Sequence, residues 1–338
     1  MTTQTDTVRS REIRLASRPT GEPSDANFAL ATADVGPPGD GEVLVKNTLM
    51  SVEPYMRGRM NDAKSYVPPF QIGRPLEGAA IGTVIASNAP DVPFGATVLH
   101  NLGWREFSVV PAQAARVIDT SRIAADVYLG ALGTPGFTAW VGLRIIAEVK
   151  SGETIFVSGA AGAVGSMAVQ LAKRWGLRVV GSASSSEKAR FVREELGADR
   201  AFDYHDGPAK ALRELAPDGI DVYFDNVGGE QLEAAIFATR NHARIVLCGA
   251  ISQYNATAPT GPRNLGLAIG RRLRLQGFIV IDHLQRLGEF VAEVAPLIAA
   301  GEVTSRSTVV DGLENAPQAL MTMLKPNANV GKAVVRIG

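Results

Sequence analysis

The chain has 338 residues, of which 46% are hydrophobic and 20% charged, and its 34 basic residues balance its 34 acidic ones. This length suits about two domains with buried cores, and the balanced charge argues against a surface that mainly binds polyanions. A single cysteine excludes an internal disulfide. Because the start is polar and no apolar run approaches roughly 20 residues, we expect a cytoplasmic protein without a membrane span.

Residues 11–118 have the pattern of short β-strands. Alternating runs such as EVLVKNTLMSV and AAIGTVIAS are separated by Pro/Gly clusters such as GPPGDG and APDVPFG. This spacing is typical of a small twisted barrel or sandwich. Between Ile123 and Val149 the pattern becomes helical, and we expect Pro135 to interrupt that helix.

From Glu153 onward, strands alternate with amphipathic helices. Strands are predicted in TIFVSGA, LRVVGSA, RAFDY, DVYFDNV, ARIVLCGA and LRLQGFIVID. Near-continuous apolar strands alternating with helices indicate a parallel sheet that is covered on both faces. After Leu297, a helix in NAPQALMTML and two short strands in TSRSTVVDGL and KAVVRIG follow.

The first strand–helix junction of this region is rich in glycine. In VSGAAGAVGS, the pattern A-x-G-x-x-G places Ala160 where the first glycine of a dinucleotide-binding turn usually stands. Gly162 would let the backbone approach a pyrophosphate, and Gly165 would let the helix pack close to the sheet. The junction therefore predicts a dinucleotide site, with a plain Gly/Ala-rich turn as the alternative.

The next strand, in VVGSASSSEK, ends without the Asp or Glu that usually binds the ribose hydroxyls of NAD. Serines and Lys188 stand there instead, and they offer hydroxyl donors and a positive charge to the extra phosphate of NADP(H). We therefore predict NADP(H) as the cofactor. The alternative is that Lys188 lies on a solvated helix face beside Glu187.

Metal-assisted and nucleophilic catalysis lack suitable residues. The first domain has no cysteine and one histidine, His100, whereas a zinc-dependent alcohol dehydrogenase needs thiolate and imidazole ligands, so we predict no metal site. The other histidines, His205, His242 and His283, are scattered and are expected to be surface or capping residues. No Ser/His/Asp or Cys/His arrangement is present.

A tyrosine hydroxyl can stabilise an oxygen that gains charge, since its ordinary pKa of about 10 keeps it protonated at pH 7. Tyr254 follows the strand end LCGAIS, at the edge where ligands bind in open α/β sheets. Tyr55, in EPYMRGRM, comes from the β-rich domain and could face Tyr254 across a cleft. Tyr223 lies within an apolar strand and is expected in the core.

At these residues the sequence resembles the zinc-free branch of the medium-chain dehydrogenases/reductases, specifically the prostaglandin reductase and alkenal double-bond reductase family. The resemblance rests on SVEPYMRGRM, GWREFSVV, GTPGFTAW, SGAAGAVGSMAVQLAK, YFDNVGGE, LCGAISQYN, GFIVID and NANVGKAVV. It implies an α/β fold with a GroES-like β-rich domain at 1–125, a Rossmann doubly wound parallel sheet domain at 126–296, and a C-terminal return to the first domain at 297–338.

The resemblance also implies the residues of the cofactor site. Gly162, Ala163 and Val164 would hold the pyrophosphate, and Lys188 with Tyr204 the phosphate at the adenosine end. The rest of the cofactor would be lined by Thr138, Asn226, Cys248, Gly249, Ala250, Ile251, Ser252, Gln253, Tyr254, Phe278, Ile279, Val280 and Asn329. Cys248 is expected to be a wall residue rather than a nucleophile.

By the same resemblance, the protein would reduce the carbon-carbon double bond of α,β-unsaturated ketones or aldehydes with NADPH, usually as a homodimer. Tyr254, with Tyr55 as a second donor, would bond to the carbonyl or enolate oxygen or relay the proton. Two alternatives stay open: a quinone reductase of the same superfamily, and a non-catalytic NADPH-binding protein. We expect neither nucleic acid nor membrane as a partner, and residues 61–75, which would shape the substrate mouth, leave the substrate unassigned.

Overall fold

The structure, a computed structural model, describes residues 7–258, 260–325 and 329–337. These residues form two compact units. The first unit comprises residues 7–129, 307–325 and 332–337, and the second comprises 130–258, 260–306 and 329–331. The chain leaves the first unit after Leu129 and returns to it after Arg306, except for residues 329–331. The family resemblance implied boundaries after residues 125 and 296.

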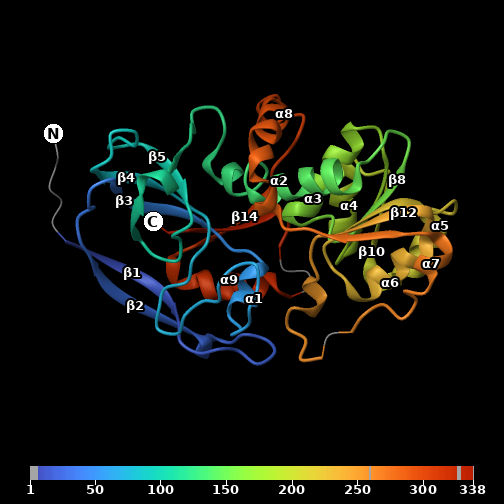
Figure 1. Cartoon of the computed structure of the whole chain (residues 1–338), viewed down its shortest axis with the longest axis horizontal. Coiled ribbons are helices and arrows are strands. Elements are labelled where there is room, and N and C mark those ends of the chain that lie inside the picture. Colours follow the sequence, from blue (N-terminus) through green and yellow to red (C-terminus); the bar gives the residue numbers. More distant parts are fainter. Residues whose placement is uncertain (1–6, 259, 326–328, 338) are drawn as a thin grey trace. The chain divides into compact units, whose positions relative to one another are not determined.

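The first unit is built on β-structure, as the pattern of residues 11–118 predicted (Figure 1). Its seven-stranded sheet has the order β14-β15-β3-β4-β5-β7, with β6 paired to β3, and β1 pairs with β2 separately. The strands are β1 Val8–Leu15, β2 Phe28–Val35, β3 Glu42–Ser51, β4 Ala80–Ser87, β5 Thr97–His100, β6 Phe107–Pro111, β7 Arg116–Val117, β14 Ser307–Asp311 and β15 Lys332–Arg336. The helices are η1 Asp25–Asn27, α1 Tyr55–Arg59, η2 Ala112–Ala114, η3 Ala125–Leu129, η8 Leu313–Asn315 and α9 Ala316–Met323.

His100 serves the fold of this unit. Its ring is buried, with Nε2 2.9 Å from Oδ1 of Asn47, and the backbone N–H of Leu102 donates to Nδ1 at 3.1 Å. Burial lowers the pKa of His100 to about 4, and the charge of Arg105 adds to this effect. The imidazole is therefore neutral at pH 7, with both nitrogens satisfied.

The second unit holds the predicted parallel sheet. All its neighbouring strands are parallel, in the order β10-β9-β8-β11-β12-β13. The strands are β8 Thr154–Val157, β9 Arg178–Ala183, β10 Arg200–Asp203, β11 Ile220–Asp225, β12 Thr239–Leu247 and β13 Arg274–Gly277. The direction of winding reverses between β8 and β11, and in such sheets ligands bind outside the carboxyl ends of the strands at this point.

Helices cover both faces of this sheet: α3 and α4 lie on one face, and α5, α6 and α7 lie on the other (Figure 1). The α-helices of the unit are α2 Thr134–Val141, α3 Ala163–Arg174, α4 Ser186–Glu194, α5 Pro208–Leu215, α6 Gly229–Ala238, α7 Leu267–Arg271 and α8 Leu287–Ala299. Shorter turns are η4 Gly142–Ala147, η5 Tyr204–Asp206, η6 Ile251–Gln253 and η7 Val280–Arg286. The helical segment is interrupted at 130–133, just before the expected position, and Pro135 is the second residue of α2, where a missing N–H costs nothing.

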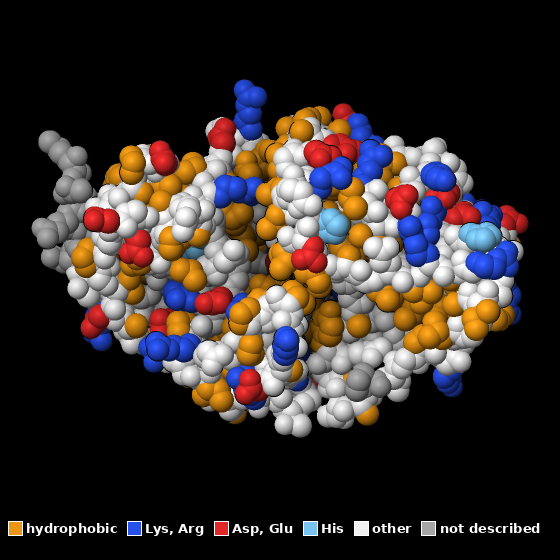
Figure 2. Space-filling view, in the orientation of Figure 1, with side chains coloured by type: hydrophobic (Ala, Val, Ile, Leu, Met, Phe, Trp, Pro, Cys, Tyr) orange, Lys and Arg blue, Asp and Glu red, His pale blue; other side chains and the backbone are white. Residues whose placement is uncertain are grey.

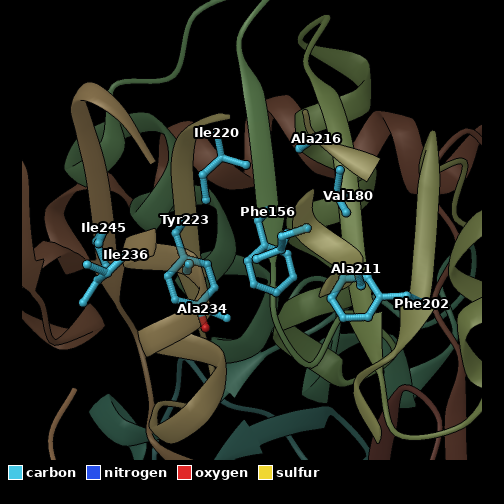
Figure 3. Packing of buried hydrophobic residues seen from close by; sticks show 12 residues of the cluster. Phe156, Val180, Phe202, Ala211, Ala216, Ile220, Tyr223, Ala234, Ile236 and Ile245 are labelled. Atoms are coloured by element: carbon cyan, nitrogen blue, oxygen red, sulfur yellow. The ribbon is translucent and has the colours of Figure 1, made fainter. Parts of the chain in front are cut away.

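A layer of aromatic rings holds the strands of this sheet against α5 and α6. The ring of Phe156 stacks on that of Tyr223, with centroids 4.9 Å apart, and on that of Phe202 at 5.8 Å (Figure 3). Small side chains such as Ala211 and Ala234 let the two helices approach this layer. Tyr223 is fully buried, as expected for a core residue.

Basic and acidic side chains are interspersed on the face in Figure 2, in keeping with the zero net charge. Among the residues that the structure describes, no helix is long and apolar enough to cross a membrane. Within the same residues, no three His, Cys, Asp or Glu side chains are grouped so that they could hold a metal ion.

Candidate active site

The turn between β8 and α3 forms the first part of the site. Gly159 has a φ of +59°, and the N–H of Gly162 donates to the Gly159 carbonyl oxygen at 3.0 Å. A Cβ on Gly165 would lie 2.2 Å from that oxygen, so only glycine lets α3 begin this close to the turn. A Cβ on Gly162 would meet, among the described atoms within 4 Å, only the same oxygen at 3.3 Å. A ligand can therefore approach the backbone at Gly162.

The N-terminus of α3 supplies donors for an anion. Gly162 is the N-cap, and the first helical bond runs from the N–H of Ser166 to the Gly162 carbonyl at 2.8 Å. The N–H groups of Ala163 and Val164 therefore have no acceptor within the helix. Such donors and the helix dipole favour an anion at this end of α3, and the binding of a pyrophosphate by these residues stays a prediction.

Residues 329–331, which belong to the second unit, lie along this turn. The N–H of Gly331 donates to the Ala161 carbonyl at 2.8 Å, and Gly331 and Gly162 form a parallel β-bridge. The side-chain amide of Asn329 donates to the Gly331 carbonyl at 3.2 Å. This contact brings Asn329, predicted from the C-terminal segment, next to the turn.

The ends of β9 and β10 form the second part of the site. Asp203 pairs with Ala183, so Tyr204 and Ser184 follow side by side at the carboxyl edge of the sheet. The Nζ of Lys188 lies 3.3 Å from the Oγ of Ser184. Burial lowers the pKa of Lys188, whereas the charge of Glu187 opposes this. Lys188 therefore points back toward the strand end, as an adenosine-phosphate ligand would.

The serines of this strand end have different tasks. Ser182 is buried, and its hydroxyl donates to Oε1 of Gln231, so the expectation that it offers a donor to the phosphate is wrong. Ser185 is the N-cap of α4, where its Oγ accepts the N–H of Lys188 at 3.2 Å. The cap fixes the first turn of α4, from which the Lys188 side chain extends.

The third part of the site is the end of β11, where a buried carboxylate organises the loop. Oδ1 of Asp225 accepts the hydroxyl of Tyr223 at 2.7 Å and the N–H groups of Val227 and Gly228 at 2.9 and 2.8 Å. Burial raises the pKa of Asp225, and these hydrogen bonds oppose the rise. The loop that follows β11 is thereby held on its own strand.

Asn226 is oriented by the neighbouring strand. Its Nδ2 donates to the Ser158 carbonyl at 2.7 Å, and its backbone N–H donates to the Ser158 Oγ at 2.9 Å. With the amide nitrogen bound in this way, the side-chain carbonyl of Asn226 is turned away from Ser158. It can then accept a hydrogen bond from a ligand at the carboxyl edge.

The run 248–254 folds over the ends of β11 and β12. The N–H groups of Cys248 and Gly249 donate to the Asp225 carbonyl at 2.9 and 3.0 Å. Burial raises the pKa of Cys248 to about 12, and the charge of Asp225 adds to this. The thiol is therefore protonated at pH 7, which fits a wall residue and not a nucleophile.

Tyr254 lies at the end of this run. The N–H of Ala250 donates to its hydroxyl oxygen at 3.3 Å, so the hydroxyl hydrogen can be donated elsewhere. Burial raises the pKa of Tyr254 further above 10, with smaller contributions from Cys248 and Asp225. The side chain is thus a neutral donor over the physiological pH range.

The remaining cofactor residues occupy separate elements of the second unit. Phe278 and Ile279 follow β13 directly, and Val280 begins η7, so the strand is shorter than the predicted LRLQGFIVID. In the run 248–254, the hydroxyl of Ser252 donates to the Val227 carbonyl at 2.6 Å. Thr138 donates to the Thr134 carbonyl within α2 at 2.8 Å, and its contact with the nicotinamide stays a prediction.

Tyr55 belongs to the first unit, where it is the first residue of α1. Burial raises its pKa, and the charge of Glu53 adds to the rise. Oε1 of Glu53 accepts the hydroxyl of Ser51 at 2.6 Å and lies 3.0 Å from the Nζ of the buried Lys332. The role of Tyr55 as a second donor stays a prediction.

Sequence reasoning did not single out Asp225 or Lys332. Each is a charged residue inside an apolar strand pattern, DVYFDNV and KAVVRIG respectively. A buried charge in such a run requires a partner, and that requirement is the signal that could have identified both residues.

Comparisons with known proteins agree with this arrangement. Residues 11–118 match the family model of the N-terminal domain of oxidoreductases, and residues 163–298 match that of zinc-binding dehydrogenases. The chain is 45% identical to the putative NADP-dependent oxidoreductase YfmJ of Bacillus subtilis, over 98% of each chain. It is 41% identical to the NADPH-dependent curcumin reductase of Escherichia coli, over 97% of each. It is 38% identical to the 2-alkenal reductase (NADP(+)-dependent) of Nicotiana tabacum, over 98% of each.

A solved structure shows the same fold with the cofactor bound. CurA from Vibrio vulnificus in complex with NADPH superimposes with a TM-score of 0.92 at 40% identity, over 97% of this chain and 99% of that one. The parallel sheet with its glycine turn, the β-rich unit and these full-length relatives lead to one conclusion. The chain belongs to the zinc-free medium-chain dehydrogenases/reductases and is an NADP-dependent oxidoreductase with GroES-like and Rossmann domains.

Proposed function

We propose that the protein reduces the carbon-carbon double bond of α,β-unsaturated ketones or aldehydes with NADPH. The observation that carries the proposal is the neutral hydroxyl of Tyr254 at the carboxyl edge of the cofactor sheet. The names of the tobacco 2-alkenal reductase and the bacterial curcumin reductase support this substrate class.

The described residues fit the cofactor. The backbone at Gly162 is open to a ligand, the first N–H groups of α3 are unpartnered within the helix, and Lys188 offers a cation at the end of β9. When bound, NADPH supplies the hydride. The side-chain carbonyl of Asn226 and the loop 248–254 would orient the nicotinamide half.

The contribution of the protein to the reaction is a hydrogen bond to the substrate oxygen. When the β-carbon of an enone accepts hydride, negative charge moves to the carbonyl oxygen and an enolate forms. A donor that is already in place stabilises this oxygen more in the transition state than in the ground state. Tyr254 would supply that bond, with Tyr55 as a second donor, and the α-carbon is protonated afterwards.

Two alternatives make different predictions. A quinone reductase of the same superfamily would consume NADPH faster with quinones than with enones. A non-catalytic NADPH-binding protein would bind the cofactor tightly and would reduce neither quinones nor enones. We also propose that the protein is cytoplasmic and forms a homodimer, and light scattering of the purified protein tests the dimer directly.

The test is a substrate panel of 2-alkenals, enones and 1,4-quinones, each measured with NADPH and NADH side by side. We expect NADPH to be preferred and enals or enones to be the fastest substrates. With NADPH deuterated at the transferred position, the label should appear at the β-carbon of a saturated carbonyl product. Label on the carbonyl carbon, or a faster reaction with quinones, would overturn the proposal.

A further inference from the structure

We propose that His205 determines cofactor specificity: it binds the carboxylate of Asp203 and braces the ring of Tyr204, and so keeps the adenosine end selective for a phosphate. The inference rests on the proposed NADP(H) site and extends it to two residues, His205 and Asp203, that have no assigned role there.

Asp203 and His205 form a closed turn at the end of β10. Oδ1 of Asp203 accepts the backbone N–H of His205 at 3.1 Å and lies 2.7 Å from its ring Nδ1. The side chain of Asp203 is 16% exposed and that of His205 is 50% exposed. The imidazole therefore covers the carboxylate and itself faces solvent.

The residue between them is the predicted phosphate ligand. The ring of Tyr204 stacks on that of His205, with centroids 4.1 Å apart and planes at 30°. The pKa of Tyr204 is raised by burial and, to a smaller extent, by the charge of Asp203. The carboxylate is thus close enough to act on the Tyr204 hydroxyl, and the imidazole fixes the position of the ring.

Asp203 lies one strand away from the place where an NAD site carries its acid. It pairs with Ala183, and Ser184, the next residue along β9, contacts Lys188. The carboxylate that is absent from VVGSASSSEK is therefore present on the neighbouring strand. Its acceptor oxygen, however, is already used twice by His205.

Release of this carboxylate would change the chemistry of the site. A free carboxylate at the strand edge accepts hydrogen bonds from ribose hydroxyls and repels a phosphate dianion. Glu187 and Lys188 lie in the first turn of α4, where the charge of Glu187 acts on Lys188, and Asp206 follows in η5. Holding Asp203 against His205 keeps its Oδ1 from accepting a ribose hydroxyl, while Lys188 beside Ser184 offers a cation to the phosphate.

The experiment measures binding of 2′,5′-ADP and 5′-AMP to the full-length protein by calorimetry. Neither ligand contains nicotinamide, so the ratio of their affinities does not depend on the enone reaction. We expect the wild type to prefer 2′,5′-ADP, and Lys188→Ala to reduce that preference as a positive control.

Two substitutions separate the two tasks of His205. His205→Phe keeps a ring for Tyr204 but cannot donate to Asp203, and we expect it to lower the affinity ratio about tenfold. His205→Asn keeps a donor at the position of Nδ1 and should retain most of the ratio. In the double variant Asp203→Asn/His205→Phe, removal of the charge should restore the ratio.

His242→Asn serves as the matched control. His242 is an exposed residue of β12 with a φ of +63°, which asparagine tolerates, and its replacement should leave the ratio unchanged. An unchanged ratio in His205→Phe, equal weakening of both ligands, or no recovery in the double variant would each overturn the inference. A wild type without preference for 2′,5′-ADP would instead refute the NADP(H) assignment itself.

Discussion

Lys332 and Glu53 form a buried ion pair within the first unit, with Nζ and Oε1 3.0 Å apart. The Nζ of Lys332 is also 2.5 Å from the Oγ of Ser51. Burial lowers the pKa of Lys332, and the charge of Glu53 opposes this. The pair ties β15 to Glu53, which follows the end of β3 and lies two residues before Tyr55.

We expect Lys332→Met to destabilise the protein by about 3–5 kcal/mol, because it leaves the Glu53 carboxylate buried without a counter-charge. The double variant Glu53→Gln/Lys332→Met should recover most of this loss. Urea unfolding followed by tryptophan fluorescence measures both, with the exposed Lys46→Met on β3 as control. If the single and the double variant lost the same free energy of unfolding, lost packing and not the unpaired charge of Glu53 would explain the destabilisation.

Tyr254→Phe should lower turnover about 100- to 1,000-fold while NADPH affinity stays nearly unchanged, because only the hydroxyl that meets the developing oxyanion is lost. Steady-state kinetics with an enone and NADPH titrations measure the two effects. Tyr128→Phe is the control, since that hydroxyl donates to the Asp119 carbonyl in the first unit. Unaltered turnover in Tyr254→Phe would make the tyrosine a wall residue.

The neutral state of His100 predicts a pH dependence of stability. Its pKa is about 4 in the folded chain and about 6.5 in the unfolded chain. Between about pH 6.5 and pH 4, His100 is therefore protonated in the unfolded chain but not in the folded chain. The free energy of unfolding should fall by up to about 3 kcal/mol between pH 7 and pH 4, and this contribution should fall no further below pH 4.

Urea titrations at pH 7, 6 and 5 check this, with wild type compared to His100→Gln. The difference between the two slopes isolates the histidine from the other titrating groups. If the free energy of unfolding changed with pH by the same amount in wild type and in His100→Gln, the prediction would be contradicted.

Gly331→Ala should weaken NADPH binding about tenfold and destabilise the protein by about 1–3 kcal/mol. Gly331 has a φ of +69°, and a Cβ added there would lie 1.9 Å from the Arg306 carbonyl oxygen. Residues 329–331, which lie along the turn between β8 and α3, must therefore move. NADPH titration and urea unfolding measure the two effects. Gly36→Ala is the control because nothing described lies within 4 Å of a Cβ there.

The features that sequence predicted well are governed by local geometry. The glycine turn was predictable because the roles of Gly162 and Gly165 depend on residues within six positions of them. The parallel sheet followed from the near-continuous apolar strands, which require cover on both faces. The interruption of the helical segment lies at 130–133 and not at Pro135 itself, because a proline in the first turn of a helix and one inside it look alike in a hydrophobic pattern.

The features that sequence missed depend on distant partners. Ser182 was expected to face the phosphate, but its hydroxyl is taken by Gln231 on α6, 49 positions further along the chain. The ion-pair partner of Lys332 is Glu53, which is 279 positions away in the sequence. By contrast, Asp203 and His205 are two positions apart, and an acceptor followed by a donor at a strand end is a signal that a sequence can show.

The cofactor unit is encoded in two separate stretches of the chain. Residues 329–331 complete the edge of the phosphate turn, yet the segments on both sides of them, 307–325 and 332–337, belong to the other unit. A gene fragment for residues 130–306 alone would lack the bond from Gly331 to Ala161 and the side chain of Asn329. Transfer of the whole cofactor unit between relatives by domain shuffling therefore requires the exchange of two segments, and so four crossovers, with these three late residues moved together with the sheet.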